Sequence, residues 1–558
     1  MKKTYSFTIF LSILLLLFFN SLTAQTIGLI SNLSGNEEDG YVLFAPQYSD
    51  TTYLMDKCGK LVHTWASNYM PGLDVYLLQD GSLLRTGHVA NHVFDPPGGS
   101  AGGIIQRYDW NGNLLWQYIL SDSMQTQNHD ICYMPNGNIL LAVWEVISDS
   151  EAIANGRKPS TLGANLWVAK VIEIQPVGTD SANIVWSWRV WDHLIQDYDS
   201  TKLNYGVVAD HPELLNLNYI DTTVYVDTKL DWLHLNQVIY NPNLDQVMIS
   251  AHNLNEIWII DHSTDSNTAA AHTGGVHHKG GDFLYRWGNP AAYNRGTLTD
   301  KKLFQQHDPE WITSGKYVNQ IRIFNNGNGR FGGNASSVDI INPPVDSEGN
   351  YHIADSAAYG PGSLTWTYET TPPSNFYTAY EGGAQTLPNG NTLICQALQG
   401  ILFETDTNKN IVWKYINPVN NGQRAAQGAN PTILTKNFIY RCTFYQASYS
   451  GFAGHTLVPG LPIEKNPLSY TCTTPLGAAT VQIQREALEV FPNPANNTIN
   501  VQSDNINLLE LRDITGRVLL HKKFANTNIV ELTTAELPDG VYILCINNAQ
   551  YKQVVIRH

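Results

Sequence analysis

The sequence predicts an all-β protein, a six-bladed β-propeller followed by a small C-terminal β-sandwich domain. Three observations lead to this prediction: the residue composition, a unit that recurs along the chain, and a change of pattern near residue 475. Of the 558 residues only 15% are charged, whereas 43 are Gly, 29 are Tyr and 14 are Trp. Turn-forming residues between aromatic-rich segments are typical of proteins built from short strands.

The first half of the recurring unit is a hairpin. It occurs at 77–87 (LLQDGSLLRTG), at 133–143 (YMPNGNILLAV) and at 386–396 (TLPNGNTLICQ). Asp-Gly and Asn-Gly pairs between apolar runs favour tight turns that join antiparallel strands. Each stretch therefore predicts two adjacent strands.

The second half of the unit is a polar turn followed by a strand that ends near a Trp. It occurs at 56–65 (DKCGKLVHTW), at 108–118 (YDWNGNLLWQY) and at 405–415 (TDTNKNIVWKY). The two halves together give four short antiparallel strands, which is the composition of a propeller blade.

Six tryptophans mark the expected blade ends, so the sequence predicts six blades. Insertions at 145–165 and 190–230 make their spacing uneven, and residues 430–460 are expected to close the ring. A β-sandwich is the alternative fold for this region, but it does not explain a recurring unit of this length. The six tryptophans are Trp65, Trp116, Trp186, Trp287, Trp366 and Trp413.

The N-terminal residues 1–24 have the parts of a signal peptide. Lys2 and Lys3 are basic, an apolar run extends from Phe7 to Phe19, and small residues surround a cleavage site after Ala24. The alternative is a membrane anchor, but this apolar run is shorter than the ~20 residues that a helix needs to span a bilayer. We therefore expect an exported protein with no membrane span after cleavage.

The formal net charge of −16 and the lack of a basic patch argue against a nucleic-acid partner. Export permits disulfide bonds, but six cysteines allow 15 pairings, and no pairing is assigned from the sequence. The six are Cys58, Cys132, Cys395, Cys442, Cys472 and Cys545.

The pattern changes near Pro475, which divides the mature chain into a propeller (25–470), a linker (471–487) and a C-terminal domain (488–558). Alternating apolar and polar residues with turns at Asn-Pro, Thr-Gly and Asp-Gly predict a small antiparallel sandwich. The stretches VFPNPANN, DITGRV and LPDGVYIL resemble the C-terminal sorting domain of the type IX secretion system of Bacteroidetes. The resemblance implies passage through the outer membrane by that machinery, to the cell surface or the medium.

Three histidines are candidate functional residues of the propeller. His129, His234 and His307 each lie near the start of a predicted strand in a different blade, and corresponding strand ends of a propeller point to one mouth of its channel. A strand also places Asn236 on the same face as His234. A lone histidine in such a protein is more often structural, but three that converge on one mouth favour a shared functional site.

Two chemistries fit such a group of histidines. Three imidazoles could hold zinc with water as a fourth ligand, although no HExxH motif is present. Alternatively, a neutral imidazole could attack a sulfuryl or phosphoryl centre as a nucleophile while other donors stabilise its oxygens. The His-rich segment HTGGVHHKGG at 272–281 looks like a metal-binding tract, but its glycines favour an ordinary exposed loop.

From about residue 28 to 460 the sequence resembles the bacterial arylsulfate sulfotransferase family. The motifs that carry the resemblance occur in order: GYVLFAP, YLMDKCGKLVHTW, HDICYMPNGNILL, DWLHLNQVIYNPNLDQVMISAHNLNEIWIID, GGDFLYRWGNP, FQQHDPEWI and AQTLPNGNTLICQALQGILFETD. The family has a six-bladed propeller, which agrees with the repeats. Its members move a sulfuryl group between phenols through a covalent sulfohistidine, without a nucleotide sulfate donor.

The resemblance implies roles for the matching residues. His307 in QQHD corresponds to the histidine that accepts the sulfuryl group, and His129 and His234 correspond to groups that bind sulfate oxygens or handle the phenol proton. The family has an arginine in the strand after HLN, whereas this sequence has His252. The further substrate-binding candidates are Asn236, His252, Tyr445 and His455, the last two from the closing segment.

Asp308 is either a residue that orients His307 or a turn residue, and the sequence leaves both open. The leading hypothesis is an exported aryl-sulfate sulfotransferase with a phenolic sulfate donor, a phenol acceptor and neither cofactor nor metal. The alternatives are a sulfatase that passes the sulfuryl group from the same intermediate to water, and a non-catalytic propeller that binds surface ligands.

Overall fold

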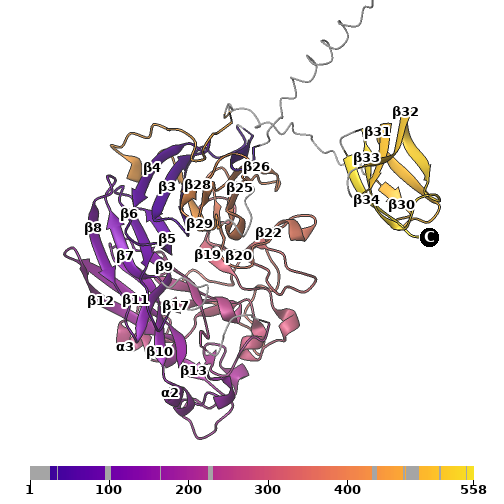
Figure 1. Cartoon of the computed structure of the whole chain (residues 1–558). Helices are drawn as coiled ribbons and strands as arrows, with labels where there is room; N and C mark the ends of the chain where they lie inside the picture. Colours follow the sequence, from indigo (N-terminus) through magenta and orange to yellow (C-terminus); the bar gives the residue numbers. More distant parts are fainter. Residues whose placement is uncertain are drawn as a thin grey trace, which may run out of the picture. The chain divides into compact units, whose positions relative to one another are not determined.

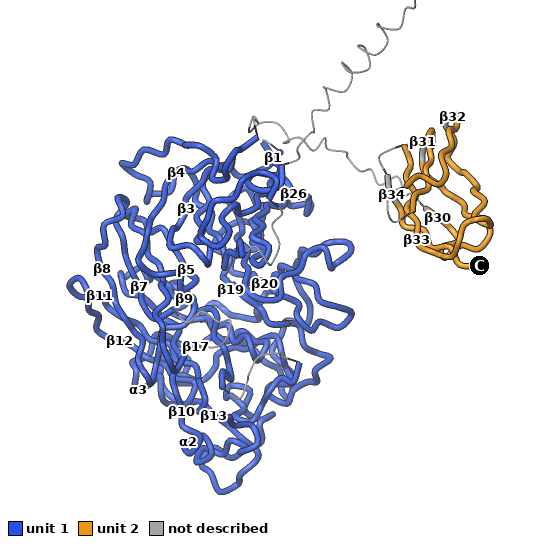
Figure 2. Tube along the Cα trace, in the orientation of Figure 1, with its two compact units in different colours: residues 1–477 blue, residues 478–558 orange. Residues whose placement is uncertain are grey.

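The computed structural model describes residues 25–33, 35–94, 102–163, 165–223, 230–429, 436–468, 472, 489–513, 517–547 and 550–558. The predicted signal peptide (1–24) lies outside the described residues, as does the predicted linker (471–487) apart from Cys472. The chain divides into two compact units, Met1–Gly477 and Ala478–His558 (Figure 2).

Unit 1 is a six-bladed β-propeller, as the repeats predict (Figure 1). Each blade is an antiparallel sheet whose first-named strand lines the central channel. Blade 1 contains β29 (Ile439–Gln446), β2 (Gly40–Pro46), β3 (Thr51–Asp56) and β4 (Leu61–Ala66); blade 2 contains β5 (Pro71–Leu77), β6 (Leu83–His88), β7 (Gly103–Tyr108) and β8 (Leu114–Ile119); blade 3 contains β9 (Gln125–Tyr133), β10 (Ile139–Ile147), β11 (Leu166–Val177) and β12 (Ser181–Arg189).

The remaining blades follow in chain order around the ring. Blade 4 contains β15 (Leu235–Asn241), β16 (Gln246–Ala251), β17 (Glu256–Asp261) and β18 (Tyr285–Trp287); blade 5 contains β19 (His307–Trp311), β20 (Ile321–Asn325), β21 (Ser337–Ile341) and β22 (Trp366–Tyr368); blade 6 contains β23 (Gly383–Thr386), β24 (Thr392–Gln396), β25 (Ile401–Thr405), β26 (Ile411–Ile416) and the N-terminal β1 (Gly28–Asn32).

Two pairings close the ring. Strand β29, from the segment predicted to close it, is the inner strand of blade 1 and pairs with β2. At the other end of the described propeller, β1 pairs with the outer strand β26 of blade 6. Blade 1 pairs Gly40 with Gln446, about 400 residues further along the chain, so both ends of the propeller segment are needed before the ring is complete.

The predicted hairpins form where the Asp-Gly and Asn-Gly pairs lie. Gly81, Gly137 and Gly390 have φ angles of 82°, 86° and 90°, in the left-handed region that glycine adopts without a steric penalty. They lie in the turns that join β5 to β6, β9 to β10, and β23 to β24. These three turns therefore fix the register of the inner strands of blades 2, 3 and 6.

The recurring tryptophans connect neighbouring blades. Trp65 in β4 donates from Nε1 to Asp109 O of blade 2 at 3.0 Å, and Trp116 in β8 donates to Ser181 O of blade 3 at 2.9 Å. The ring of Trp366 instead lies 5.5 Å from Nζ of a lysine of blade 6. The remaining pairs are Trp186 with Thr264, Trp287 with Pro361, Trp413 with Lys57, and Trp366 with Lys409.

Each of the six predicted blade-end tryptophans thus contacts the next blade of the ring. An indole offers a large apolar surface and one N–H donor, and both are used when it packs across a blade boundary. The recurrence of Trp in the sequence follows from this repeated contact.

The predicted insertions hold the short elements of the propeller. Within 145–165 lie the helix α2 (Asp149–Ala154) and the helical turn η1 (Pro159–Thr161), and within 190–230 lie η2 (Val190–Asp192), β13 (Leu194–Ile195), η3 (Val208–Asp210) and β14 (Leu215–Asn216). The others are η4 (His252–Leu254), α3 (Ser266–Ala269), η5 (Pro290–Tyr293), η6 (Leu298–Asp300), η7 (Pro373–Asn375), η8 (Ala397–Gln399), β27 (Val419–Asn420), β28 (Gln423–Arg424) and η10 (Ser450–Phe452).

Unit 2 is an all-β unit with its own hydrophobic core. One sheet joins β30 (Glu489–Phe491), β31 (Thr498–Asp513), β33 (Gly540–Ile546) and β34 (Gln550–Ile556) in that order, and β32 (Val518–Thr533) pairs with β31. The apolar residues that alternate along β31, such as Ile499, Val501, Leu509 and Leu511, are at most 1% exposed. The alternation predicted from the sequence therefore separates a buried from an exposed face.

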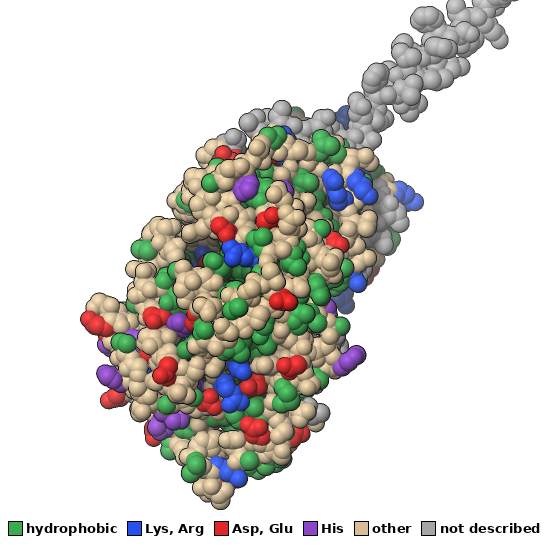
Figure 3. Space-filling model, turned by 90° about the vertical axis from the view of Figure 1, so that its left-hand side faces the viewer, with side chains coloured by type: hydrophobic (Ala, Val, Ile, Leu, Met, Phe, Trp, Pro, Cys, Tyr) green, Lys and Arg blue, Asp and Glu red, His purple; other side chains and the backbone are tan. Residues whose placement is uncertain are grey.

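Among the described residues, no helix is both long enough and apolar enough to cross a membrane. On the face shown in Figure 3, acidic and basic side chains are scattered among polar and apolar ones.

One disulfide joins Cys58, in the turn between β3 and β4, to Cys472 at the end of the propeller unit, 414 residues away. It covalently links blade 1 to the chain segment that follows the closing strand. Such a link restricts the unfolded chain, which is the main way a disulfide stabilises a fold. The cysteines outside disulfides are Cys132, Cys395, Cys442 and Cys545.

We expect the Cys58→Ser, Cys472→Ser double variant to unfold at a lower temperature than the wild type, because removing a native disulfide costs about 2–5 kcal/mol. Differential scanning calorimetry with and without reductant measures the effect. Reductant should lower the midpoint of the wild type but not of the double variant. Equal sensitivity of the two proteins to reductant would contradict a stabilising role for this bond.

Candidate active site

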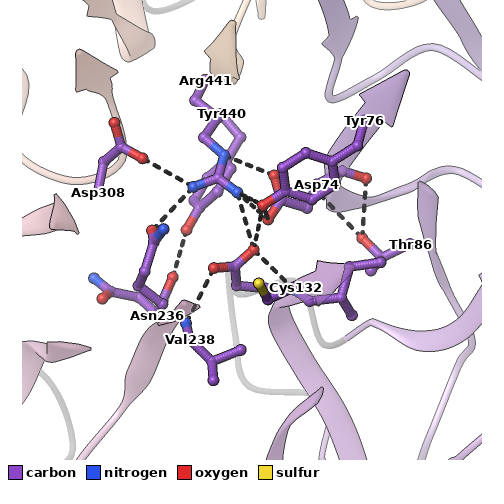
Figure 4. Close-up of polar contacts among 12 residues, drawn as sticks. Asp74, Tyr76, Thr86, Cys132, Asn236, Val238, Asp308, Tyr440 and Arg441 are labelled. Carbon is purple, nitrogen blue, oxygen red and sulfur yellow. Dashed lines mark hydrogen bonds and ion pairs between the residues drawn. The ribbon is translucent and has the colours of Figure 1, made fainter. Parts of the chain in front are cut away.

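The centre of the channel is occupied by the guanidinium of Arg441, which lies in β29 (Figure 4). Its Nε donates to Asp74 Oδ1 at 2.7 Å, its Nη1 donates to Gln237 Oε1 at 3.0 Å and Asp308 Oδ1 at 2.9 Å, and its Nη2 donates to Asp130 Oδ1 at 2.9 Å. Asp308 Oδ2 in turn accepts from the backbone N–H of Ala384 at 2.8 Å. We call these residues the Arg441 hub.

The hub draws on the inner strand of every blade. Arg441 comes from blade 1 and Asp74 from blade 2, and the remaining members come from β9, β15, β19 and β23. Five donors in a fixed planar fork let one arginine bond to partners on several sides at once, which a lysine cannot do. The hub therefore sets how closely the six inner strands approach.

The hub contains more carboxylates than cations. Burial and the nearby Asp130 raise the pKa of Asp74 well above its usual range, against the opposing effect of Arg441. Tyr76 adds a phenol O–H that donates to Asp130 Oδ1 at 2.9 Å and also contacts the guanidinium. The raised pKa of Asp74 reflects the cost of burying several carboxylates beside a single cation.

Four histidines and one tyrosine lie next to the hub. The ring centroids of His129 and His234 are 4.7 Å apart, those of His234 and His252 5.0 Å, and those of His252 and His307 5.2 Å. Tyr440 lies 6.2 Å from both His129 and His307, at the two ends of the series. The five rings form an arc that nearly closes on itself, which we call the histidine arc.

Outer partners fix the protonation of the arc. Nδ1 of His129, His252 and His307 faces the Oδ1 atoms of Asn128, Asn253 and Asn326, respectively. Each of these amides donates its N–H to backbone carbonyls, so its oxygen must be the atom that faces the imidazole.

His234 is held in the same way by a carboxylate. Its Nδ1 lies 2.5 Å from Asp231 Oδ2. All four histidines thus carry a proton on Nδ1, and in the neutral state Nε2 is the atom with the free lone pair.

Burial favours the neutral form of three histidines of the arc, His129, His252 and His307. Desolvation, followed by the neighbouring histidines, lowers the pKa of His129 and His252 well below the usual value of 6.5. Desolvation also lowers the pKa of His307 to about 3, against the bond to Asn326. A neutral imidazole is the nucleophilic form, so His307 is ready to attack over nearly the whole pH range in which proteins are folded.

The structure brings four of the predicted histidines and Asn236 together. The side-chain amide of Asn236 donates from Nδ2 to Gln306 O at 2.8 Å, and its buried Oδ1 has no hydrogen-bond partner. The Tyr440 hydroxyl donates to the backbone oxygen of Asn236 at 2.8 Å. His307 Nε2 accepts from the backbone N–H of Glu381 at 3.2 Å. The His234 side chain is 19% exposed and is the most accessible of the arc.

The two candidates from the closing segment lie elsewhere. The backbone N–H of Leu77 donates to the Tyr445 hydroxyl at 2.9 Å. Tyr445 lines a cavity of about 620 Å³. Cys132, Glu310 and Thr443, which line this cavity, each lie two residues after a hub residue on an inner strand. His129, His307 and Tyr440 of the arc lie one residue before the same hub residues. His455 stacks on Trp110 at 4.2 Å between ring centroids, near the turn that follows β5.

Asp308 belongs to the hub and does not contact the imidazole of the neighbouring His307. Asn326 from the end of β20 orients that imidazole instead. Arg441, Tyr440 and Asn326 were not predicted from the sequence. One signal could have found the arginine: in FIYRCTF it is the charged residue within an otherwise uncharged inner strand.

The comparisons with known proteins decide the family. The family model for arylsulfotransferase (ASST) matches residues 33–441, about three quarters of the chain. The chain belongs to the arylsulfotransferase family. The model for the secretion system C-terminal sorting domain matches residues 489–557 of this arylsulfotransferase, and it supports secretion or a cell-surface location.

No curated protein matches this chain. Among solved structures, a protein of unknown function from Bacteroides caccae is 8% identical, with 73% of this chain and 100% of that chain covered and a TM-score of 0.38. A virginiamycin B lyase from Staphylococcus aureus is 10% identical, with 69% and 86% covered and a TM-score of 0.31. AztD from Citrobacter koseri is 8% identical, with 73% and 98% covered and a TM-score of 0.31. Such distant similarity carries no argument about function.

We expect the Arg441→Gln variant of this arylsulfotransferase to lose about 3–5 kcal/mol of propeller stability, because its three carboxylate partners stay buried without their cation. The loss should be larger at pH 8 than at pH 5, since burial raises the pKa of Asp74, Arg441 no longer opposes that shift, and protonation neutralises this carboxylate as the pH falls. Guanidinium-induced unfolding at both pH values measures the change.

Arg107→Gln is the matched control, because the Arg107 and Asp80 side chains form an ion pair while 29% and 55% exposed. Such a surface pair contributes about 0–1 kcal/mol. Equal losses in the two variants would show that the hub does not hold the inner strands together.

Proposed function

We propose that the protein transfers a sulfuryl group from a phenolic sulfate ester to an acceptor phenol through a covalent intermediate on His307. The observation that carries the proposal is the neutral His307, whose Nδ1 proton is held by Asn326 and whose Nε2 lone pair accepts only one long hydrogen bond, from Glu381 N–H. The family match supports arylsulfotransferase chemistry in general. Export to the cell surface or medium follows from the sorting domain.

In the first half-reaction Nε2 of His307 attacks the sulfur, the ester S–O bond breaks, and the phenolate leaves. The hydrogen bond from Glu381 N–H to Nε2 has to open for this attack, and its length of 3.2 Å makes it a weak one. The product is a sulfo-imidazolium whose proton stays on Nδ1, hydrogen-bonded to Asn326 Oδ1. In the second half-reaction an acceptor phenol gives its proton to Nε2 of a neutral arc histidine, its oxygen attacks the sulfur, and the S–N bond breaks to release neutral His307.

The other arc residues would bind the sulfuryl oxygens and move the phenol proton. Nε2 of His129, His234 and His252 has a lone pair in the neutral state and must gain a proton before it can donate to an anionic oxygen. Donor binding therefore takes up protons from solvent. The buried Oδ1 of Asn236 is free to accept a hydrogen bond from a phenol O–H.

Positioning supplies much of the rate in such a reaction. By analogy with phosphoryl transfer, the transition state is loose and the protein mainly aligns the reactants and stabilises charge. Five rings held by outer amides and by the hub give the necessary rigidity. A sulfatase would use the same first half-reaction with water as the acceptor.

We expect His307→Ala to lower sulfuryl transfer from 4-nitrophenyl sulfate to phenol by about 10⁴-fold or more, as removal of a nucleophile does. Mass spectrometry of wild-type protein quenched with donor alone should find a sulfuryl group on His307. The exposed His352→Gln serves as the control that keeps activity, because this side chain is 70% exposed. Intact turnover in His307→Ala would rule out the nucleophile assignment.

The same assay separates the alternatives. If nitrophenol is released at equal rates with and without added phenol, and inorganic sulfate is formed, the enzyme is a sulfatase. If no turnover occurs with a panel of phenyl sulfates while the ligands still bind, the propeller is a binding module.

We expect His252→Arg to bind aryl sulfates about tenfold more tightly at pH 8 than the wild type does, because an arginine brings a permanent charge and a charge-assisted bond. Wild-type affinity should weaken as the pH rises, since burial lowers the pKa of His129 and His252 and both must take up protons on binding. Measurement of KM from pH 6 to 9 tests this, with His252→Gln as the neutral control. An equal pH dependence in wild type and His252→Arg would contradict a role for His252 in binding the sulfate.

A further inference from the structure

The His-rich segment at 272–281 is not explained by the proposed function. Its first histidine, His272, lies beside His193 and Asp282, and the possible ligand atoms of these three residues all lie within 4.8 Å of one another. Among the described residues, these three form the one group of His, Cys, Asp or Glu side chains, at least three in number, whose ligand atoms lie this close together. The histidine arc does not meet it.

The hydrogen bonds of His193 have the arrangement that is typical of metal-ligating histidines. Its side chain is fully buried and stacks on Trp188 at 5.6 Å between ring centroids. Its Nε2 donates to Ala269 O at 2.9 Å, which leaves Nδ1 facing Asp282 Oδ1 at 2.7 Å. A metal-ligating histidine generally donates its other N–H to a carbonyl or carboxylate, which fixes the ring.

Both ring nitrogens of His193 therefore face acceptors. A neutral imidazole has one N–H, which His193 uses at Nε2, so its Nδ1 lone pair and Asp282 Oδ1 both face the space in which a cation could bind. His272, which is 57% exposed, turns its own Nδ1 to the same Asp282 Oδ1 at 2.8 Å. Two imidazole nitrogens thus point at one carboxylate oxygen.

The backbone around the group is shaped to allow this approach. A Cβ at Gly281 would lie 2.0 Å from Ala269 O and 2.8 Å from His193 Nε2, so a side chain cannot be accommodated there. Trp188 Nε1 donates to Gly281 O at 2.7 Å and fixes the segment just before Asp282. Two of the three possible ligands are therefore rigidly placed, and the exposed His272 can adjust.

We propose that His193, His272 and Asp282 bind a divalent transition metal ion such as Zn²⁺, with solvent completing the coordination. Zinc bonds to imidazole nitrogen and carboxylate oxygen at about 2.0–2.2 Å, which places neighbouring ligand atoms about 3.2–3.5 Å apart. The present separations of 2.7 and 2.8 Å need to open by less than about 1 Å, which is within reach of an exposed histidine on a loop.

The ion would connect two blades. His193 follows β12 of blade 3, whereas His272 and Asp282 lie between β17 and β18 of blade 4. Lys279 lies near Asp282 and places a positive charge near the site, but the carboxylate of Glu213 lies near the same lysine and offsets it. The site is therefore structural, and the inference does not depend on the proposed sulfuryl transfer.

Metal binding to the untagged mature protein tests the proposal. After chelator treatment and dialysis, the protein is titrated with Zn²⁺, and bound zinc is measured by mass spectrometry of the metal along with the thermal midpoint. We expect one zinc per chain and a raised midpoint. In His272→Ala and Asp282→Asn the affinity should fall at least about tenfold.

Two controls make the result specific. His278→Asn removes a neighbouring exposed histidine at a φ of 57°, a conformation that asparagine tolerates, and should bind zinc like the wild type. His307→Ala should also keep its zinc, which excludes binding by the histidine arc. The proposal is overturned if the wild type binds no zinc, if His272→Ala binds as the wild type does, or if His307→Ala loses the ion.

Discussion

The propeller depends on a single buried guanidinium. Arg441 bonds directly to side chains from the inner strands of four other blades, and Asp308 extends the contact to the sixth. A channel lined by six strand edges has no side chain large enough to fill it from one blade alone. One planar cation surrounded by carboxylates solves this problem, because each blade contributes a short polar group to a shared centre.

The hub and the histidine arc are linked by adjacent residues. His129 precedes Asp130, His307 precedes Asp308, and Tyr440 precedes Arg441. Adjacent residues of a strand face opposite ways, yet here both members of each pair serve the channel. The φ angles of His129 and Asp308, 52° and 51°, show how two of the strands achieve this. Backbone in this region costs a non-glycine residue free energy, which the ion pairs and hydrogen bonds of the hub can offset.

Much of this arrangement could be predicted from the sequence, and the remainder depends on contacts between distant segments. Trp65 and Trp116 predict the blades because each blade repeats the same local contact. The convergence of His129, His234 and His307 follows from the geometry of any propeller. The use of Asp308 could not be inferred, because its partner Arg441 lies 133 residues away. The same holds for Asn326, which orients His307 from the end of another strand.

The position of Arg441 explains why the arc must obtain its positive charge in another way. The guanidinium lies next to the arc, but its donors are taken by Asp74, Asp130 and Asp308, so little of its charge is available to a bound anion. The resemblance places His252 where the family has an arginine, and burial lowers the pKa of His129 and His252, which favours their neutral form. In the sulfuryl transfer that we propose, a bound sulfate ester would raise the pKa values of these imidazoles by its negative charge. Nucleophile and anion-binding groups would then be the same kind of side chain: His307 would meet the sulfur with its lone pair, and the others would meet the oxygens with a proton.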